Sequence, residues 1–136
     1  MKINIQDLKD KLKYSYSPYS NFKVAALAID ENNHKYYGVN CENIAFPSGL
    51  CAERAALFAS VVNGAKVGSF KEIHIISSGK DTILPCSGCR QVMLEFMQPD
   101  SMVYCYNGDG NLNLEITLDK LNPYGVWPNT LKLNEK

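Results

Sequence analysis

Two short stretches of the sequence decide the fold and the chemistry: Cys51-Ala52-Glu53 and Pro85-Cys86-Ser87-Gly88-Cys89. Cys86 and Cys89 are three residues apart, so at a helix start their sulfurs fall on the same side. Cys51 supplies a third thiolate from a separate segment. A structural zinc site normally has four protein ligands, whereas three ligands and an open position are typical of catalytic zinc. The spacing therefore predicts one Zn²⁺ per chain, bound by Cys51, Cys86 and Cys89.

Glu53 is the candidate catalytic residue. It follows Cys51 by two positions, a spacing that would separate the two side chains in the middle of a helix. In the first turn of a helix, both can instead point past the helix end toward a shared ligand. A glutamate beside the open metal position can carry protons between water and a substrate.

Arg54 is expected to balance the charge of the metal site. Three thiolates and Zn²⁺ together carry one negative charge, which makes the metal a poorer Lewis acid. A helix start favours thiolates by about 0.3–1 kcal/mol, and Arg54 directly follows Glu53. An ordinary position on the helix surface is the alternative for this arginine.

A structural zinc site that supports an interaction module is the alternative for the whole cluster. It would need a fourth ligand from Cys41, Cys105, His34 or His74. Cys105 and His74 fall in predicted strands and are expected to belong to the core. Cys41 lies in the loop that leads to the site, where a small apolar role is expected.

Length and composition indicate one globular domain spanning residues 1–136, because 136 residues with 46% hydrophobic side chains can build a core. Fourteen basic and fourteen acidic residues cancel, which weighs against nucleic acid and anionic membranes as partners and fits a small neutral substrate. The N-terminus lacks an apolar signal segment, and no run is long enough to span a membrane. A Cys-x-x-Cys pair is more typical of metal binding in the cytoplasm than of a disulfide.

Hydrophobic periodicity predicts strands joined by helices, and hence an α/β fold. Helices are expected over residues 3–14, from about 51 to 62, and from 86 to a stop at Pro99. Strands are expected over residues 22–29, 34–39, 69–76, 101–106 and 112–118. The first two strands should form a hairpin and the later ones should be joined by parallel crossovers, with an irregular tail after Pro123.

Four motifs resemble those of the small cytidine deaminases with three-cysteine zinc sites. They are residues 16–24 (YSPYSNFKV), 40–45 (NCENIA), 51–54 (CAER) and 85–91 (PCSGCRQ). The pattern of cysteines and glutamate is also that of zinc deaminases in general. Order and spacing agree from about residue 16 to residue 123, which is most of the chain.

The resemblance implies a three-layer α-β-α sandwich with a mixed five-stranded sheet, assembled as a homotetramer. It implies zinc-dependent hydrolysis of cytidine and deoxycytidine to uridine and deoxyuridine with release of ammonia, as in pyrimidine salvage. Deamination of another aminopyrimidine nucleoside, or of a base in nucleic acid, is the enzymatic alternative. The neutral charge weighs against nucleic acid.

The resemblance also assigns substrate contacts. Asn40 and Glu42 would bind hydroxyls of the ribose, and the backbone of Ala52 would contact the pyrimidine edge. Phe22 would pack against the pyrimidine, although a plain core role fits it equally well. Arg54 would hydrogen-bond to the zinc thiolates. Gln91 would support the zinc ligands without binding the metal itself.

The sequence departs from the family pattern at three places. Cys41 stands where an aliphatic residue is usual, and Ala25 where glycine is usual. The tail lacks the phenylalanine that in the family reaches a neighbouring subunit's active site. Tyr124 or Trp127 could substitute for it, and the sequence leaves this open. The tail also resembles that of blasticidin-S deaminases, which lack the Asn-x-Glu-Asn loop present here.

Overall fold

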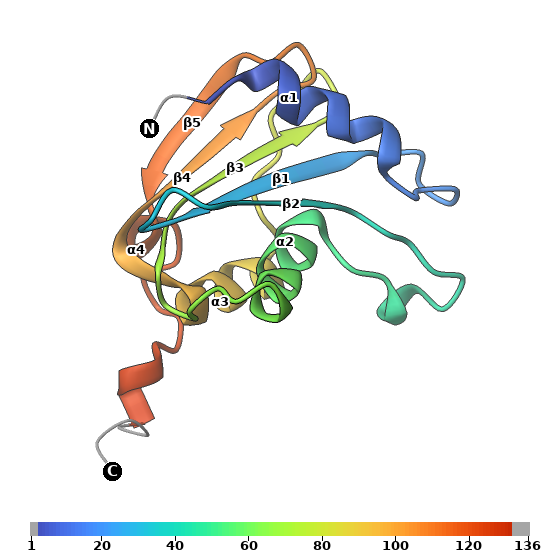
Figure 1. Ribbon diagram of the computed structural model, residues 1–136. Helices are drawn as coiled ribbons and strands as arrows, with labels where there is room; N and C mark the ends of the chain where they lie inside the picture. Colours follow the sequence, from blue (N-terminus) through green and yellow to red (C-terminus); the bar gives the residue numbers. More distant parts are fainter. Residues whose placement is uncertain (1–2, 132–136) are drawn as a thin grey trace.

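The computed structural model describes residues 3–131 and contains one mixed five-stranded sheet (Figure 1). Its strand order is β2-β1-β3-β4-β5. The strands are β1 Val24–Asp30, β2 Lys35–Val39, β3 Phe70–Ser77, β4 Met97–Tyr106 and β5 Leu112–Thr117. The predicted mixed sheet and the β1–β2 hairpin are confirmed. Only β3 and β4 are parallel, so the expectation of several parallel crossovers was wrong.

Helices cover both faces of the sheet and complete the predicted three-layer sandwich (Figure 1). They are α1 Ile5–Asp10, α2 Ala52–Val62, α3 Ser87–Phe96 and α4 Leu118–Leu121. On one face, Leu8 of α1 packs with Ala25, Leu27 and Ile29 of β1. On the other face, α2 and α3 pack against β1, β3 and β4 in the larger hydrophobic cluster. No helix within residues 3–131 is long and apolar enough to cross a membrane.

Gly38 of β2 fixes the position of the first turn of α2. A Cβ atom at Gly38 would lie 2.4 Å from the backbone nitrogen of Ala56 and 2.5 Å from the backbone oxygen of Ala52. Real Cβ atoms do not approach backbone so closely, so only glycine permits this contact. The strand and the start of α2 therefore touch backbone to backbone, beside Cys51.

Several element boundaries differ from the expectations. The first helix is α-helical only to Asp10 and continues as a 3₁₀ turn, η1 Lys11–Tyr14. The tail contains a further 3₁₀ turn, η3 Pro128–Leu131, and η2 Phe46–Ser48 lies in the loop before α2. A short helix, α4 Leu118–Leu121, follows β5 directly.

Pro99 lies inside β4 and does not precede it as expected. Phe70 pairs with Met97, whereas Glu72 pairs with Met102, so β4 carries extra residues between these two pairs. Such a bulge leaves its residues outside the regular ladder, where the missing N–H of proline costs no hydrogen bond. α3 therefore passes directly into β4 at Met97.

Candidate metal and substrate site

The starts of α2 and α3 bring the three predicted cysteines together. Cys51 and Cys86 are the residues that precede the first turns of these helices, and Cys89 lies in the first turn of α3. The Sγ atoms of Cys51 and Cys86 are 3.9 Å apart, those of Cys86 and Cys89 are 3.3 Å apart, and all three lie within 4.8 Å. Sulfurs bound to one tetrahedral zinc lie about 3.8 Å apart, given Zn–S bonds of about 2.3 Å. The cluster therefore fits one Zn²⁺ per chain.

The pKa values of two of the cysteines also favour a bound cation. A hydrogen bond from the Cys89 thiol, followed by the Arg54 contact, lowers the pKa of Cys51 to about 5 despite its partial burial. The same contact with Cys51, together with burial, raises the pKa of Cys89 well above its ordinary value. The cluster thus holds a thiolate readily at Cys51 and resists one at Cys89. A divalent cation removes this resistance, because metal-bound cysteines are deprotonated.

Arg54 extends from α2 to the cysteines. Its Nη2 atom donates a hydrogen bond to Sγ of Cys51 over 3.3 Å. The guanidinium also faces Gly88 of α3, where an added Cβ would lie 3.7 Å from Cζ of Arg54. Hydrogen bonds to Cys51 raise the pKa of Arg54 further, so the group is a permanent cation between the two helices.

Glu53 occupies the first turn of α2 and is only 5% exposed. Burial raises the pKa of Glu53 above its usual range. A carboxyl group with a raised pKa can take up and release a proton near neutral pH. Its place beside the cysteines suits it to proton transfer.

Two adjoining cavities lie at this site. The inner cavity, about 180 Å³, is lined by Cys51, Glu53, Cys86 and Ser77 among others. The outer cavity, about 540 Å³, is lined by residues of the two loops before β1 and α2, including Glu42 and Ser20. Asn40 and Cys51 line both cavities, so the smaller space opens into the wider one.

Asn40 lies between the cavities and organises the loop before β1. Its Oδ1 accepts hydrogen bonds from the Ser15 hydroxyl and from the backbone N–H of Val24, at 2.9 Å from the latter. Its Nδ2 donates to the backbone oxygen of Phe22 over 2.8 Å. An amide nitrogen carries two hydrogens, so one donor of Asn40 is left for a ligand.

Glu42 lies in the outer cavity and binds the turn at residues 19 and 20. Oε1 of Glu42 accepts from the backbone N–H groups of Tyr19 and Ser20 at 3.0 and 3.1 Å, and Oε2 accepts from the Ser20 hydroxyl. The Ser20 hydroxyl is the main cause that lowers the pKa of Glu42, which keeps it ionised. A carboxylate has about four acceptor positions, so one is left for a ligand.

The remaining predicted site residues have other surroundings. Ala52 is fully buried in the first turn of α2 and lines the inner cavity. The ring of Phe22 faces Gly79, where an added Cβ would lie 3.2 Å from Cε1 of the ring. Gln91 exchanges two hydrogen bonds with the backbone of Val126, at 2.8 and 3.1 Å, and so anchors the tail. Its predicted support of the zinc ligands stays a prediction.

Two contributors were missed by sequence reasoning. Arg90 donates from Nε to the backbone oxygen of Pro85 over 2.8 Å and from Nη1 to that of Leu121 over 3.4 Å. It thereby fixes the segment before Cys86, and its place directly after Cys89 was the available signal. Ser20 accepts a hydrogen bond from the N–H of Phe22 over 3.0 Å while its hydroxyl binds Glu42. It lies within the motif of residues 16–24.

The four alternative ligands do not join the cysteine cluster. Within residues 3–131, the group of ligand atoms that meets metal geometry contains only Cys51, Cys86 and Cys89. The other candidates have these surroundings: Cys41 exchanges backbone hydrogen bonds with Leu50, Cys105 is buried in the core, His34 pairs with Asp30, and His74 contacts Tyr106. Three sulfurs without a fourth protein ligand match the catalytic arrangement of zinc.

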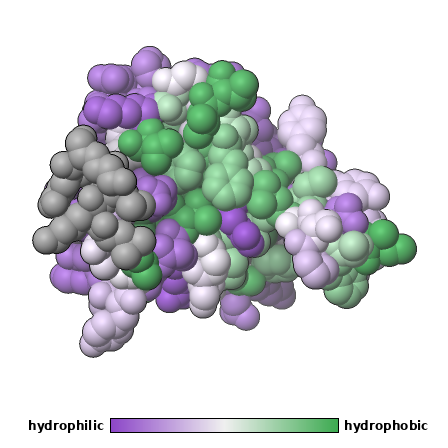
Figure 2. Space-filling model, turned by 90° about the horizontal axis from the view of Figure 1, so that it is seen from below, coloured by the Kyte–Doolittle hydropathy of each residue, from purple (hydrophilic) through white to green (hydrophobic). Residues whose placement is uncertain are grey.

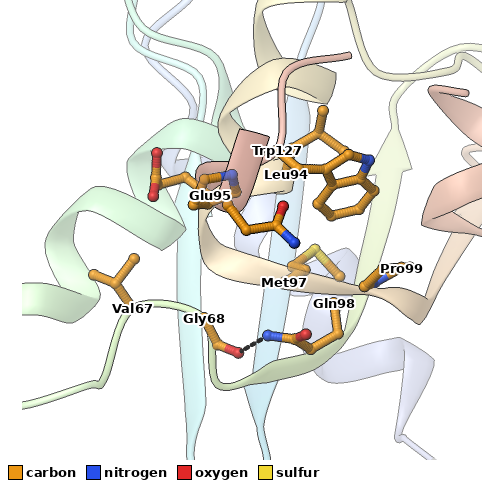
Figure 3. A pocket seen from close by; sticks show the side chains of 10 residues that line it. Val67, Gly68, Leu94, Glu95, Met97, Gln98, Pro99 and Trp127 are labelled. Atoms are coloured by element: carbon orange, nitrogen blue, oxygen red, sulfur yellow. Dashed lines mark hydrogen bonds between the residues drawn. The ribbon is translucent and has the colours of Figure 1, made fainter. Parts of the chain in front are cut away.

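A third cavity, about 620 Å³, lies between the end of α3, the start of β4 and the tail (Figure 3). Leu94, Met97 and Trp127 line it, and Gln98 donates a hydrogen bond to the backbone oxygen of Gly68 over 2.8 Å. It includes one carboxylate, that of Glu95, and no cysteine. Although it is larger, it lacks the groups that the chemistry requires.

Comparison with known proteins identifies the class. The family model for the cytidine and deoxycytidylate deaminase zinc-binding region matches residues 4–106. The curated cytidine deaminase of Mycoplasma genitalium is 36% identical over 125 residues, covering 89% of this chain and 94% of the relative. That of Sporosarcina psychrophila is 37% identical over 119 residues, covering 88% and 85%. The crystal structure of cytidine deaminase from Burkholderia pseudomallei has a TM-score of 0.83 at 34% identity, covering 90% of this chain and 95% of that one.

The fold and the cysteine cluster are therefore those of a zinc-dependent hydrolase. The chain belongs to the cytidine and deoxycytidylate deaminase family.

Proposed function

We propose that this enzyme hydrolyses cytidine and deoxycytidine to uridine and deoxyuridine, with release of ammonia, and so serves pyrimidine salvage. The observation that carries the proposal is the buried Glu53 on the wall of an inner cavity that Cys51 and Cys86 also line. The names of the curated relatives, cytidine deaminases, support the substrate.

In this proposal, Cys51, Cys86 and Cys89 are the zinc ligands. A zinc ion held there supplies Lewis-acid activation of the attacking water. Arg54 hydrogen-bonds to Cys51 and offsets the negative charge that three thiolates bring. Ala52 offers its backbone N–H, one of the groups that have no partner within the first turn of a helix, to the pyrimidine edge.

Glu53 carries the protons of the reaction. Its carboxylate accepts a proton as water adds to C4 of the pyrimidine and gives that proton to N3. It then takes the proton of the new C4 hydroxyl and gives it to the exocyclic nitrogen, which leaves as ammonia while the C4 carbonyl forms. The raised pKa of Glu53 supports this role, because a poised carboxyl group can both accept and donate. Cytidine and water are thereby converted to uridine and ammonia without any other reactant.

Asn40 and Glu42 would hold a ribose hydroxyl in the outer cavity. Asn40 has one N–H to donate and Glu42 one acceptor position to offer, after the hydrogen bonds that they make within the protein. A hydroxyl both accepts and donates, so a single sugar hydroxyl satisfies both groups. Phe22, held through its backbone by Asn40, would pack against the pyrimidine after a shift of its ring from Gly79.

We further infer that the chain is a single domain that forms a homotetramer. Hydrophobic side chains gather across the face that α2 and α3 form (Figure 2). On α2, Val62 is 86% exposed and Val61 50% exposed, in keeping with a subunit interface. Tyr124, 96% exposed, is free to reach a neighbouring subunit, whereas Trp127 packs against the core of its own chain.

A cytoplasmic location also belongs to the proposal, because a reducing cytoplasm suits five free cysteines.

The test is an ultraviolet absorbance assay with cytidine, deoxycytidine, cytosine, adenosine and blasticidin S, with zinc measured in the same samples. Cytidine and deoxycytidine should be deaminated in proportion to the zinc content. Efficient turnover of blasticidin S with none of cytidine would reassign the substrate, and turnover of free cytosine would remove the sugar from recognition.

A further inference from the structure

The hydroxyl of Ser77 is buried without a hydrogen-bond partner. Ser77 ends β3 and pairs with Val24 of β1, and it is 2% exposed. Within residues 3–131, two buried side-chain nitrogen or oxygen atoms lack a hydrogen-bond partner. They are Oγ of Ser77 and Nε of Arg54, which lies beside the cysteines. Buried hydroxyls in folded proteins are nearly always hydrogen-bonded, so this one requires an explanation.

The position of Ser77 on the strand supplies one. Alternate residues of a strand face the same side of the sheet, so Ser77 shares the side of Ile73 and Ile75, which pack in the core beneath α2 and α3. Ser77 and Ile75 both line the inner cavity, together with Glu53. The unpartnered hydroxyl therefore belongs to the small space beside the cysteines.

Little else in the inner cavity is free to recognise a polar ligand. Its other walls include the apolar side chains of Val24, Ile75, Ile83 and Leu84. The side chain of Asn40 already makes hydrogen bonds to Val24, Ser15 and Phe22, which leaves it one free N–H donor. Apolar walls with few polar groups are typical of a site that fixes the orientation of a flat ring.

We propose that Ser77 is a substrate-contacting residue whose hydroxyl hydrogen-bonds a polar ring substituent or ring nitrogen of the pyrimidine. The proposal rests on the proposed function, because it assigns the ring to the inner cavity and the sugar to the outer one. A hydroxyl can donate or accept, so it can pair with a carbonyl oxygen, a ring nitrogen or an amino group. Binding of the ring gives Ser77 the partner that the protein alone does not provide.

The test is Ser77→Ala, which removes only the hydroxyl oxygen. The kcat/KM values for cytidine and deoxycytidine should fall by the same factor, about 3- to 10-fold, as loss of one neutral hydrogen bond predicts. The factor is shared because both nucleosides carry the same ring. The dissociation constant for uridine should rise, zinc content should stay constant, and the melting temperature should hold or increase, since no protein group loses a partner.

Ser101→Ala is the matched control. Ser101 of β4 is equally buried, at 4% exposure, but its Oγ accepts from the N–H of Gln98 and donates to the backbone oxygen of Phe70, both at 2.9 Å. This variant should lose thermal stability and keep the kcat/KM of the wild type. The two serines should thus show opposite effects.

Three results would overturn the proposal. The first is a Ser77→Ala enzyme with unchanged kcat/KM and unchanged uridine binding beside an active wild type. The second is a loss confined to one of the two nucleosides, which would place Ser77 at the sugar. The third is a fall in stability like that of Ser101→Ala. A wild-type protein inactive on both nucleosides would instead refute the proposed function, and the ring contact with it.

Discussion

The guanidinium of Arg54 donates a hydrogen bond to Sγ of Cys51, so one helix supplies both a thiolate and the cation that offsets it. The two residues are three positions apart at the start of α2, where Cys51 lies just before the first turn. The same guanidinium faces Gly88 in the first turn of α3. The charge of the site is therefore balanced by the protein at the junction of the two helices that carry the cysteines.

Arg54→Ala should reduce zinc retention or turnover by about 10–100-fold while the fold persists, because it removes a partner of a ligand and not the ligand itself. Zinc content after dialysis and kcat for cytidine measure this effect. Arg54→Lys is the control, because it keeps the charge without the planar donor group. Its zinc content and kcat should lie between those of the wild type and Arg54→Ala. An alanine variant with the zinc content, turnover and pH profile of the wild type would refute charge compensation.

Glu42→Ala should impair cytidine turnover severely and leave zinc content intact. Glu42 fixes the turn at Tyr19 and Ser20 and would hold a sugar hydroxyl, so its loss should raise KM and also lower kcat. Free cytosine should be rejected by about 10⁴–10⁵-fold, as expected when polar groups of a site stay unpaired. Glu115→Ala, at an exposed glutamate of β5, is the control. An unchanged kcat/KM for cytidine would exclude Glu42 from recognition.

Acid should destabilise the protein through His74. Its ring is 3% exposed, stacks on Tyr104 with a centroid distance of 4.6 Å, and contacts the Tyr106 hydroxyl at 2.8 Å. Burial lowers the pKa of His74, an effect larger than the opposing contact with Glu72. In the unfolded chain, the pKa of this histidine is about 6.5, so below that pH the unfolded state binds more protons than the folded state. The free energy of unfolding therefore decreases as the pH falls below about 6.5.

Denaturant unfolding between about pH 7.5 and pH 5 measures this loss. His74→Gln should be less stable than the wild type at neutral pH but should lose less stability on acidification. Equal slopes for the wild type and His74→Gln would assign the acid sensitivity to other groups.

The sequence predicted those features that depend on local spacing. Cys86-x-x-Cys89 and Cys51-x-Glu53 each place their side chains through the geometry of a helix start, and the three ligands that catalytic zinc requires indicated that the two motifs meet. The strands and the end of α2 at Val62, shortly before Gly64 with its φ of 90°, likewise follow from periodicity and the preference of glycine for that conformation.

Features that depend on contacts between distant segments were not predictable. The partner of Gln91 is the backbone of Val126, which no local pattern indicates. The engagement of Glu42 with Ser20 and the isolation of the Ser77 hydroxyl arise from the pairing of loops and strands. Pro99 was expected to precede β4 because a bulge that accommodates a proline depends on the register with β3.

The most direct test of the central claim compares the wild type with Glu53→Gln for zinc content and for release of ammonia from cytidine. The wild type should bind one zinc per chain and release ammonia and uridine in equal amounts. Glu53→Gln should keep the zinc and the fold, but its turnover should fall by at least about 10²–10⁴-fold, the factor that positioned acid–base catalysis contributes. Glu95→Gln, at the glutamate lining the third cavity, should behave as the wild type. Near wild-type turnover by Glu53→Gln, or a wild type active without zinc, would contradict the account.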